Sequence, residues 1–227
     1  GGGALAYLRQ ETGHEDERPL FDEMWTAFPE ARGVDLRLHD IAARIERGDT
    51  EIDALIDEQG ALFEEFERLD GYRIDQRIGR VLDGLGFAPA DRSKLCGDFS
   101  GGWQMRIALA KILVRRPEHV LLDEPTNHLD AAAREWLAAD LEKYPGTVLI
   151  VTHDVEFLDR VAERILELRE KGVTSWTGNY SEFQRQKAQA LQLQDRAAGR
   201  QERYLAKQER FIERFRAKPS KTSAAQS

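Results

Sequence analysis

"HVLLDEPTNHLD", residues 119–130, begins with an apolar run and ends with a polar turn that contains two adjacent carboxylates. The run 119–123 has apolar residues on both faces, which is typical of a central strand in a parallel sheet. Asp123 and Glu124 end this strand, and open α/β sheets bind ligands at the carboxyl ends of their strands. One carboxylate there can hold Mg²⁺ through water, and the next can polarise a water that attacks a phosphate. The alternative is that the acidic pair only caps the following helix.

A second apolar run, "GTVLIVTHD" (146–154), predicts a second buried strand with His153 at its end. Adjacent parallel strands bring their first loop residues close together, so His153 can contact a γ-phosphate or hold the attacking water. A lone histidine is more often structural, so this residue is weak evidence by itself. Helical patterns separate and follow the two strands, and strands that alternate with helices predict an α/β fold.

The stretch "FSGGWQMR" (99–106) begins a third helical pattern with two adjacent glycines. Each glycine costs roughly 1 kcal/mol against alanine inside a helix. Ser100 lies where free N–H groups and the helix dipole attract anions. Gly101 and Gly102 let a phosphate approach the backbone closely. The stretch therefore predicts a helix start that binds phosphate.

The remaining elements follow from periodicity and turn residues. Residues 4–11 are strand-like, 12–33 are expected to be irregular, and 72–86 form another helix. A β-hairpin is expected with its turn near Gly172, and one long helix from about Ser181 that breaks near Pro219. Residues 34–49 and the segment from residue 52 predict two antiparallel helices. The second has an apolar stripe over a charged face: Ile52, Leu55, Ile56, Leu62, Phe63, Phe66 and Leu69.

The charge is distributed unevenly over the 227 residues, whose formal net charge is −8. Residues 187–227 hold ten Lys and Arg against four Asp and Glu, while residues 1–186 hold 23 against 37. This asymmetry suggests a nucleic-acid partner for the tail, with a solvated charged helix as the alternative. Arg203, Lys207, Arg210 and Arg214 recur on one helix face, beside an apolar face formed by Tyr204, Leu205, Phe211, Ile212 and Phe215.

Cys96 is the single cysteine, so an intrachain disulfide is impossible and a reducing compartment is expected. No apolar run is long enough to span a membrane, and the N-terminal residues lack the pattern of a signal peptide. We therefore expect a cytoplasmic protein with no membrane partner.

Five motifs in order resemble those of an ATP-binding cassette (ABC) ATPase from the Q-loop onward. "YLRQE" with Gln10 is similar to the Q-loop, "FSGGWQMR" to the signature, "HVLLDEP" to Walker B, "NHLD" to the D-loop and "VTHD" to the H-loop. "LDEPTNHLD" and "SGGWQMR" resemble the ABC-F proteins, which have two ATPase domains in one chain and no membrane domain. "GNYSEFQRQK" (178–187) resembles the segment before their interdomain linker, and residues 202–227 resemble the linker.

The resemblance implies an α/β fold: a partial ABC ATPase core of the P-loop NTPase type, with a helical signature subdomain. It places the core over residues 1–186, an arm-like helical hairpin at about 34–70, and a linker helix at 187–227. For ATP held by this domain, it implies Glu124 as catalytic base, His153 at the γ-phosphate, and Asp123 and Gln10 at Mg²⁺, the Asp123 contact being through water. Ser100, Gly101 and Gly102 would contact ATP held by the other domain, and Asp130 of the D-loop would also contact nucleotide.

The resemblance implies three partners: a second ATPase domain of the same parent chain, the ribosome and tRNA. No G-x-x-x-x-G-K-[ST] occurs in the chain, so we expect a fragment that is inactive alone. The alternative is a natural protein that lost this loop. Two other functional classes remain: the ATPase subunit of a membrane ABC transporter, and a non-catalytic nucleic-acid-binding module. The sequence leaves open whether ribosome, tRNA or DNA is the target.

Overall fold

The computed structural model describes residues 4–8, 17–48, 52–170 and 172–216, with side chains described as far as residue 213. The chain divides into two compact units, Gly1–Val161 and Ala162–Ser227. The boundary expected at residue 187 marks the start of the predicted linker and is a different boundary from the division into compact units. It stays a prediction.

A three-stranded parallel sheet lies in the first unit, in the order β1 (Leu5–Leu8), β2 (His119–Asp123), β3 (Thr147–Val151). The central position of β2 confirms the prediction from its apolar residues. The register aligns Asp123 with Val151, so β2 and β3 end side by side. This alignment places the residues that follow both strands at the same edge of the sheet.

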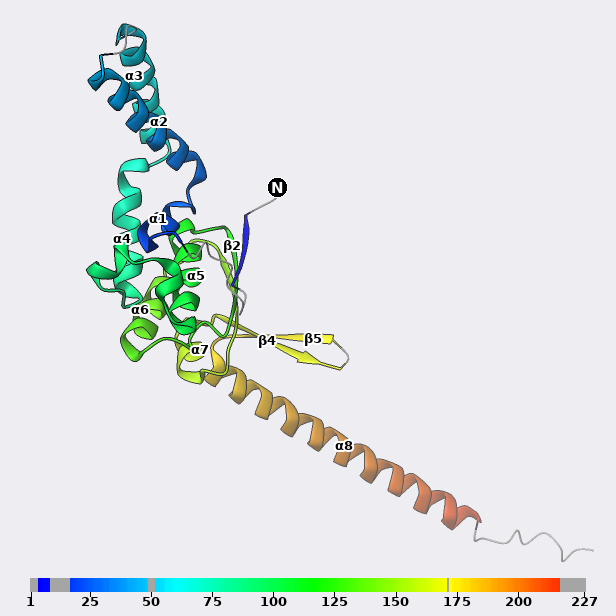
Figure 1. Ribbon diagram of the computed structural model, residues 1–227. Helices are drawn as coiled ribbons and strands as arrows, with labels where there is room; N and C mark the ends of the chain where they lie inside the picture. Colours follow the sequence, from blue (N-terminus) through cyan, green and yellow to red (C-terminus); the bar gives the residue numbers. More distant parts are fainter. Residues whose placement is uncertain (1–3, 9–16, 49–51, 171, 217–227) are drawn as a thin grey trace, which may run out of the picture. The chain divides into compact units, whose positions relative to one another are not determined.

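Helices α4 (Ile74–Gly84), α5 (Gly101–Arg115) and α6 (Ala131–Leu141) lie on one side of this sheet (Figure 1). Leu8, Val120 and Leu122 face these helices and are buried. On the other face Tyr7, Leu121 and Leu149 are aligned across the strands, and Leu149 is 44% exposed. The prediction of β3 as a buried strand is therefore wrong for this face, because no described helix packs against it.

Helix packing holds α5 against the rest of the unit through its middle and last turns. Its buried side chains include Ile107, Leu109 and Leu113, which join a single apolar core with Ile78 and Leu82 of α4. Gly84 ends α4, where an added Cβ would lie 2.0 Å from the ring of Trp136 on α6. Only glycine allows this close approach of the two helices. Helix α7 (Val155–Val161) follows β3 and ends the unit.

The segment expected to be irregular contains two helical elements, and this is a correction. Helix α1 spans Leu20–Trp25, and α2 begins at Pro29 and ends at Glu46. Pro29 suits the first turn of a helix because its fixed φ is helical and its missing N–H has no partner there. Leu20 and Met24 of α1 are fully buried, so tertiary packing stabilises this short helix.

Helices α2 and α3 (Ile52–Arg68) pair as the predicted hairpin, with Ile41, Leu55, Leu62 and Phe66 buried. Short 3₁₀ turns follow at Gly71–Arg73, Pro89–Ser93 and Cys96–Asp98. The helix expected over 72–86 is therefore a 3₁₀ turn followed by α4.

The second unit contains the antiparallel strands β4 (Arg164–Arg169) and β5 (Gly172–Thr177) and the helix α8 (Tyr180–Arg216). Leu168 pairs with Val173, and the turn lies next to Gly172 as predicted. At the start of α8, the Asn179 side chain accepts the Glu182 N–H at 3.0 Å, and the Glu182 carboxylate accepts the Asn179 N–H at 3.2 Å. This reciprocal capping satisfies two N–H groups at the helix start. The long helix is confirmed, whereas the break near Pro219 lies outside the described residues.

Candidate functional site

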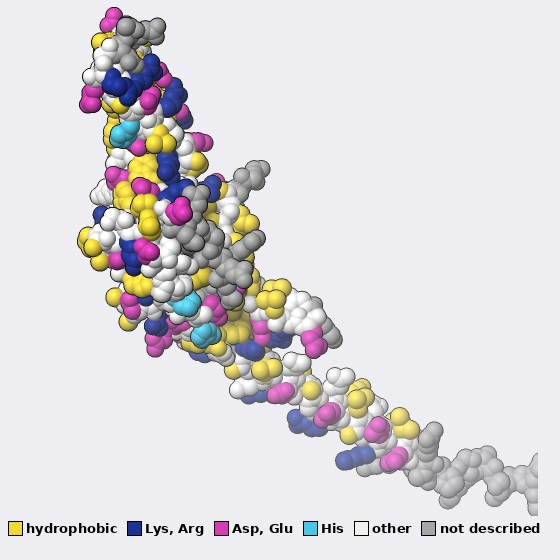
Figure 2. Space-filling model, in the orientation of Figure 1, with side chains coloured by type: hydrophobic (Ala, Val, Ile, Leu, Met, Phe, Trp, Pro, Cys, Tyr) yellow, Lys and Arg dark blue, Asp and Glu magenta, His cyan; other side chains and the backbone are white. Residues whose placement is uncertain are grey.

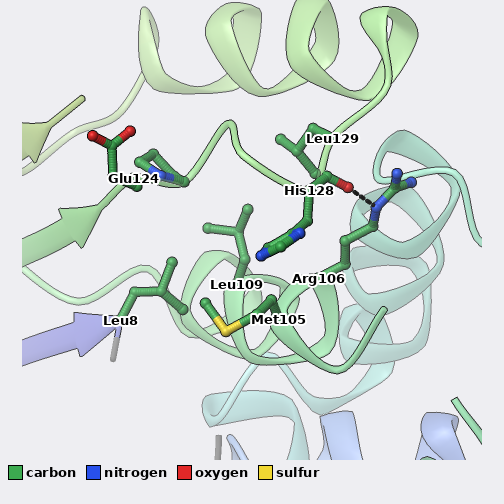
Figure 3. Close-up of a pocket in the computed structure, with 8 residues that line it drawn as sticks. Leu8, Met105, Arg106, Leu109, Glu124, His128 and Leu129 are labelled. Atoms are coloured by element: carbon green, nitrogen blue, oxygen red, sulfur yellow. Dashed lines mark hydrogen bonds between the residues drawn. The ribbon is translucent and has the colours of Figure 1, made fainter. Parts of the chain in front are cut away.

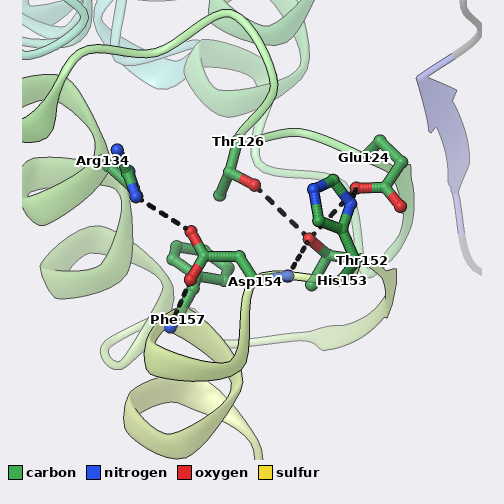
Figure 4. Close-up of polar contacts among 7 residues, drawn as sticks. All are labelled: Glu124, Thr126, Arg134, Thr152, His153, Asp154 and Phe157. Atoms are coloured by element: carbon green, nitrogen blue, oxygen red, sulfur yellow. Dashed lines mark hydrogen bonds and ion pairs between the residues drawn. The ribbon is translucent and has the colours of Figure 1, made fainter.

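The carboxyl ends of β2 and β3 bring Glu124 and His153 into contact (Figure 4). Nδ1 of His153 lies 3.0 Å from Oε2 of Glu124. The backbone N–H of Glu124 donates to the carbonyl of Val151 at 2.8 Å, which extends the strand pairing by one residue. Glu124 is 23% exposed by side chain and His153 is 77% exposed, so solvent reaches the pair from the histidine side.

Thr152 orients this pair, and the sequence analysis did not single it out. Its hydroxyl donates to Oε2 of Glu124 at 3.2 Å and accepts the backbone N–H of Asp154 at 3.2 Å. The Thr126 hydroxyl lies 3.3 Å from the hydroxyl oxygen of Thr152. A hydroxyl has one proton, so Thr126 donates to Thr152 while Thr152 donates to Glu124. Thr126 is buried in the turn after β2, and the sequence of that turn gives no signal for this chain of hydrogen bonds.

Asp154 holds the loop after β3 in place. One oxygen accepts the backbone N–H of Phe157 at 3.1 Å, and the other accepts from Arg134 of α6 at 3.2 Å. The first bond caps α7, and the second joins α7 to α6. Both position the segment that carries His153.

Glu124 has a left-handed backbone conformation, with φ of 49°. Such a φ is uncommon for a residue other than glycine and costs about 1–3 kcal/mol. The strand pairing and the two hydrogen bonds to its carboxylate retain this conformation. The side chain is thereby aimed toward β3.

The start of α5 is open to solvent. Ser100 is the N-cap residue of α5, and an added Cβ on Gly101 would meet nothing within 4 Å. At Gly102 an added Cβ would lie 3.4 Å from Nδ1 of His128. The free N–H groups at this end suit an anion, and the turn after β2 lies directly beside it through His128.

Arg106 connects the start of α5 to that turn (Figure 3). Its Nε donates to the carbonyl of His128 at 2.7 Å, and its Nη1 donates to the carbonyl of Leu85 at 3.0 Å. Nη1 also lies 3.1 Å from Oδ2 of Asp130. The guanidinium carbon lies 4.3 Å from the ring centre of Trp103, and the Arg106 side chain is 11% exposed. Sequence reasoning missed Arg106 because an arginine on a helix is usually solvated.

Asp130 serves a structural purpose here. Its Oδ1 accepts the backbone N–H of Ala133 at 2.9 Å, which caps α6. This bond from Ala133 lowers the pKa of Asp130; slight desolvation opposes the shift, and Arg106 reinforces it. The contact between Asp130 and nucleotide that the resemblance implies stays a prediction.

A small cavity lies between the strand ends and α5 (Figure 3). Its lining includes Leu8, Met105, Glu124 and His128, and its volume is about 10 Å³. Such a space holds about one water molecule. This cavity is therefore too small to hold a nucleotide.

The donor set fits a magnesium ion held mainly by water and phosphate. Within the described ranges, no group of three or more His, Cys, Asp and Glu side chains could hold a metal. Asp123, at the end of β2, supplies one carboxylate, and Mg²⁺ commonly takes one or two carboxylates with waters and phosphates. Gln10, the other predicted metal contact, lies outside the described residues.

The predicted nucleic-acid face lies on α8. Arg203, Lys207 and Arg210 are exposed, and Arg203 donates to the carbonyl of Gly199 at 2.9 Å. Tyr204 and Leu205 are also more than half exposed. Hydrophobic and charged side chains alternate along α8 in Figure 2. The side chain of Arg214 lies outside the described part.

No described helix is long and apolar enough to cross a membrane.

Comparison with protein families gives two matches. The profile described as ABC transporter matches residues 4–127, and a second profile with the same description matches residues 166–227. A solved structure described as the ATP binding subunit of an ABC transporter superposes with a TM-score of 0.54 at 16% identity, over 81% of this chain and 62% of that one. This likeness supports the ABC ATPase fold that the resemblance implied.

Three curated relatives are similar in sequence. "Probable ATP-binding protein YheS" of Escherichia coli strain K12 is 37% identical over 223 residues, which cover 98% of this chain and 33% of that protein. "ABC transporter F family member 5" of Arabidopsis thaliana is 36% identical over 88% of this chain and 29% of its own length. "Energy-dependent translational throttle protein EttA" of Mycobacterium tuberculosis strain H37Rv is 44% identical over 63% of this chain and 25% of its own. The chain spans about a third or less of the length of these relatives.

Proposed function

Because this chain belongs to the ABC transporter family, with ABC-F proteins among its relatives, we propose that it is part of an ABC-F ATPase that acts in translation. ATP binding would close two ATPase domains on each other, and hydrolysis would release them. The observation that carries the proposal is the contact between Glu124 and His153 at the ends of adjacent parallel strands. Nδ1 of His153 lies 3.0 Å from Oε2 of Glu124. Parallel strand ends are the usual ligand edge of such sheets.

Glu124 is suited to act as the general base. Thr152 and His153 both contact its Oε2, which fixes the carboxylate plane. Among the described residues no hydrogen bond involves Oε1, so Oε1 is the oxygen that takes the proton of an attacking water. Proton transfer to a positioned carboxylate contributes about 10²–10⁴-fold to a rate.

His153 would contact the γ-phosphate through Nε2. An ionised Glu124 carboxylate only accepts hydrogen bonds, so Nδ1 of His153 carries the proton in this contact. The neutral ring then has no proton on Nε2. A phosphate contact therefore requires either a second proton on the ring or rotation of His153 away from Glu124.

Asp123 would hold Mg²⁺ through water, together with Gln10, and the ion would neutralise charge on the phosphates. Ser100, Gly101 and Gly102 would contact ATP held by a second ATPase domain, because the start of α5 is open to an incoming anion. Asp130 would contribute mainly by holding α6 and Arg106.

The catalytic part of the proposal is tested in the full-length parent protein with Glu124→Gln. We expect ATP turnover to fall by at least about 10²-fold while ATP binding is retained. Glu118→Gln is the control, because it alters an exposed carboxylate just before β2, at the end of the strand opposite Glu124. Turnover by Glu124→Gln equal to that of the unaltered protein would show that another residue is the base.

The 227-residue chain itself contains no G-x-x-x-x-G-K-[ST], which supplies the main phosphate cradle in such ATPases. We expect this chain alone to show no ATP hydrolysis above its own Glu124→Gln variant.

The translational part of the proposal is supported by the printed name of EttA, a translational throttle protein, and by the predicted arm and linker. We expect the parent protein with Glu124→Gln to pellet with ribosomes in the presence of ATP, since the closed state would persist. Pelleting with membranes instead would favour a transporter subunit, and binding to DNA alone would favour a nucleic-acid-binding module. We place this activity in the cytoplasm.

The α8 face formed by Arg203, Lys207, Arg210 and Arg214 would contact RNA phosphates, with tRNA as a candidate. The logarithm of the binding constant falls linearly with the logarithm of the salt concentration, and each phosphate contact adds roughly −0.7 to −0.9 to that slope. Changing all four residues to Ala in the parent protein should weaken ribosome or tRNA binding and flatten this slope. An unchanged slope would assign α8 a structural role.

A further inference from the structure

Helix α3 has an apolar edge that its partner helix leaves uncovered. Ile52, Ile56 and Phe63 are 43%, 51% and 45% exposed. At 3.6 residues per turn, they lie within about 40° of one another around the helix axis. Leu55, Leu62 and Phe66, on the adjoining side, are buried in the hairpin. The apolar stripe of α3 is therefore wider than the area that the hairpin buries.

Gly60 lies beside this edge, between Ile56 and Phe63. An added Cβ there would meet nothing within 4 Å, so packing within the described chain does not require glycine. Glycine inside a helix costs about 1 kcal/mol against alanine. Its presence leaves a flat, accessible stretch of helix backbone next to the two exposed apolar side chains. A partner can approach the helix more closely there than over any other residue type.

The charge beside the apolar edge has one sign. Helix α3 contains six Asp and Glu and a single cation, Arg68, at its last position. Four of the acids lie on the flank away from the buried side: Asp53, Asp57, Glu64 and Glu67. In the described part of the chain, the ion pairs of α3 are those of Glu58 with Arg37 of α2 and of Glu65 with Arg68. The four flanking carboxylates are therefore available to an external cation.

We infer that this surface, the α3 face (Ile52, Asp53, Ile56, Asp57, Gly60, Phe63, Glu64 and Glu67), docks a basic amphipathic polypeptide segment. Apolar side chains of the partner would cover Ile56 and Phe63 above Gly60, and Lys or Arg side chains would pair with the four carboxylates. A nucleic-acid backbone is disfavoured here because its phosphates would meet carboxylates. The inference requires neither ATP nor a particular target of the ATPase, so it stands apart from the proposed function.

Three variant sets of the 227-residue chain test the inference. The first is the double variant Ile56→Ser with Phe63→Ser. Its control is Leu36→Ser, because Leu36 of α2 is 60% exposed and lies outside the α3 face. The second neutralises Asp53, Asp57, Glu64 and Glu67, and its control removes the same charge at exposed positions elsewhere: Glu30, Asp40, Glu118 and Glu156. The third is Gly60→Gln, which favours the helix and fills the space above it.

The probe is a fluorescent helical peptide made only of Leu and Lys, and its anisotropy is followed without nucleotide. Comparison probes are the same peptide with Glu at every Lys position, and an RNA duplex. We expect the first two variant sets to weaken binding of the Lys peptide by at least about tenfold, as loss of central contacts does. The two controls should change it less than about threefold, as exposed substitutions away from a contact usually do. Gly60→Gln should weaken binding while its melting temperature stays equal or rises.

Several results would overturn the inference. Equal binding by the variants and their controls would show that the peptide binds elsewhere. Binding of the Glu peptide or of RNA that depends on the same residues would assign a different partner. Concentration-dependent self-association that Gly60→Gln abolishes would assign a second copy of the chain. If the Ile56 and Phe63 variant fails to fold, the neutralised set and Gly60→Gln decide the outcome.

Discussion

Replacement of Arg106 by Met tests whether this residue holds α5 against the turn after β2. Arg106 donates to the carbonyls of His128 and Leu85 at 2.7 Å and 3.0 Å, and its own side chain is 11% exposed. Met fills similar space but has no donor. The change therefore leaves two carbonyl groups without their charged partner.

The expected loss follows from these contacts. Two hydrogen bonds from a charged group contribute about 1.5 kcal/mol each at the lower end of the usual range. The ion pair with Asp130, whose side chain is 57% exposed, adds less than about 1 kcal/mol. The stacking on Trp103 adds about 0.5–1 kcal/mol. We expect Arg106→Met to lower the free energy of unfolding by about 3–4 kcal/mol, since neighbouring contacts overlap.

Urea unfolding of the 227-residue chain, followed by circular dichroism, measures this loss. Arg106→Lys keeps the charge but has no planar fork, so it should lose about half as much. Arg115→Met, in the last turn of the same helix and exposed, is the matched control and should change stability by about 0.5 kcal/mol or less. A loss below about 1 kcal/mol for Arg106→Met, or equal losses at Arg106 and Arg115, would refute this reasoning.

Three further substitutions have defined outcomes. Glu23 is 2% exposed, and its burial opposes ionisation. Lys111 and Arg18 outweigh that effect and hold the pKa of Glu23 below its ordinary value. Glu23→Ala should therefore lower the free energy of unfolding in urea by about 3 kcal/mol at neutral pH. Because that pKa is lower in the folded state, the contribution is complete above about pH 4.5 and disappears as pH falls through the folded pKa, so the two proteins should converge in acid. Gly84→Ala should lower the melting temperature, with a loss of about 1–3 kcal/mol, because its Cβ would overlap the Trp136 ring; an unchanged melt would mean that α4 and α6 can separate freely. Asp130→Ala should cost about 1 kcal/mol as a lost helix cap, and its lowered pKa confines the difference to pH values above that pKa; a difference that persists in strong acid would contradict this.

Local pattern was sufficient for the elements with strong periodicity. The apolar residues of 119–123 identified a central parallel strand, and α8 follows from a long polar run without proline. The spacing of apolar residues predicted the stripe of α3, of which Leu55, Leu62 and Phe66 are buried, whereas Ile52, Ile56 and Phe63 are 43%, 51% and 45% exposed. In each case the side-chain period matches the element itself, so no distant residue is needed to recognise it.

Chemistry at the strand ends was partly predictable. Acidic and histidine residues at the ends of two apolar runs pointed to one edge of a sheet, and the structure joins Glu124 to His153 there. The hydroxyls of Thr126 and Thr152 were not predictable, because a threonine in a turn has no distinctive pattern. Their purpose depends on the register of β2 against β3, which places residues 26 positions apart within hydrogen-bonding distance.

The sequence by itself determined the α/β class, the order of the motifs, the helical hairpin and the long C-terminal helix, because these depend on residue period and on local turn residues. Only the tertiary structure decided that α1 is helical, that one face of β3 is exposed, and that Arg106 joins α5 to the turn after β2. The physical reason is the same in all three: burial and hydrogen-bond partners come from segments far apart in the chain. Their free energy exceeds the weak local preferences of the residues involved.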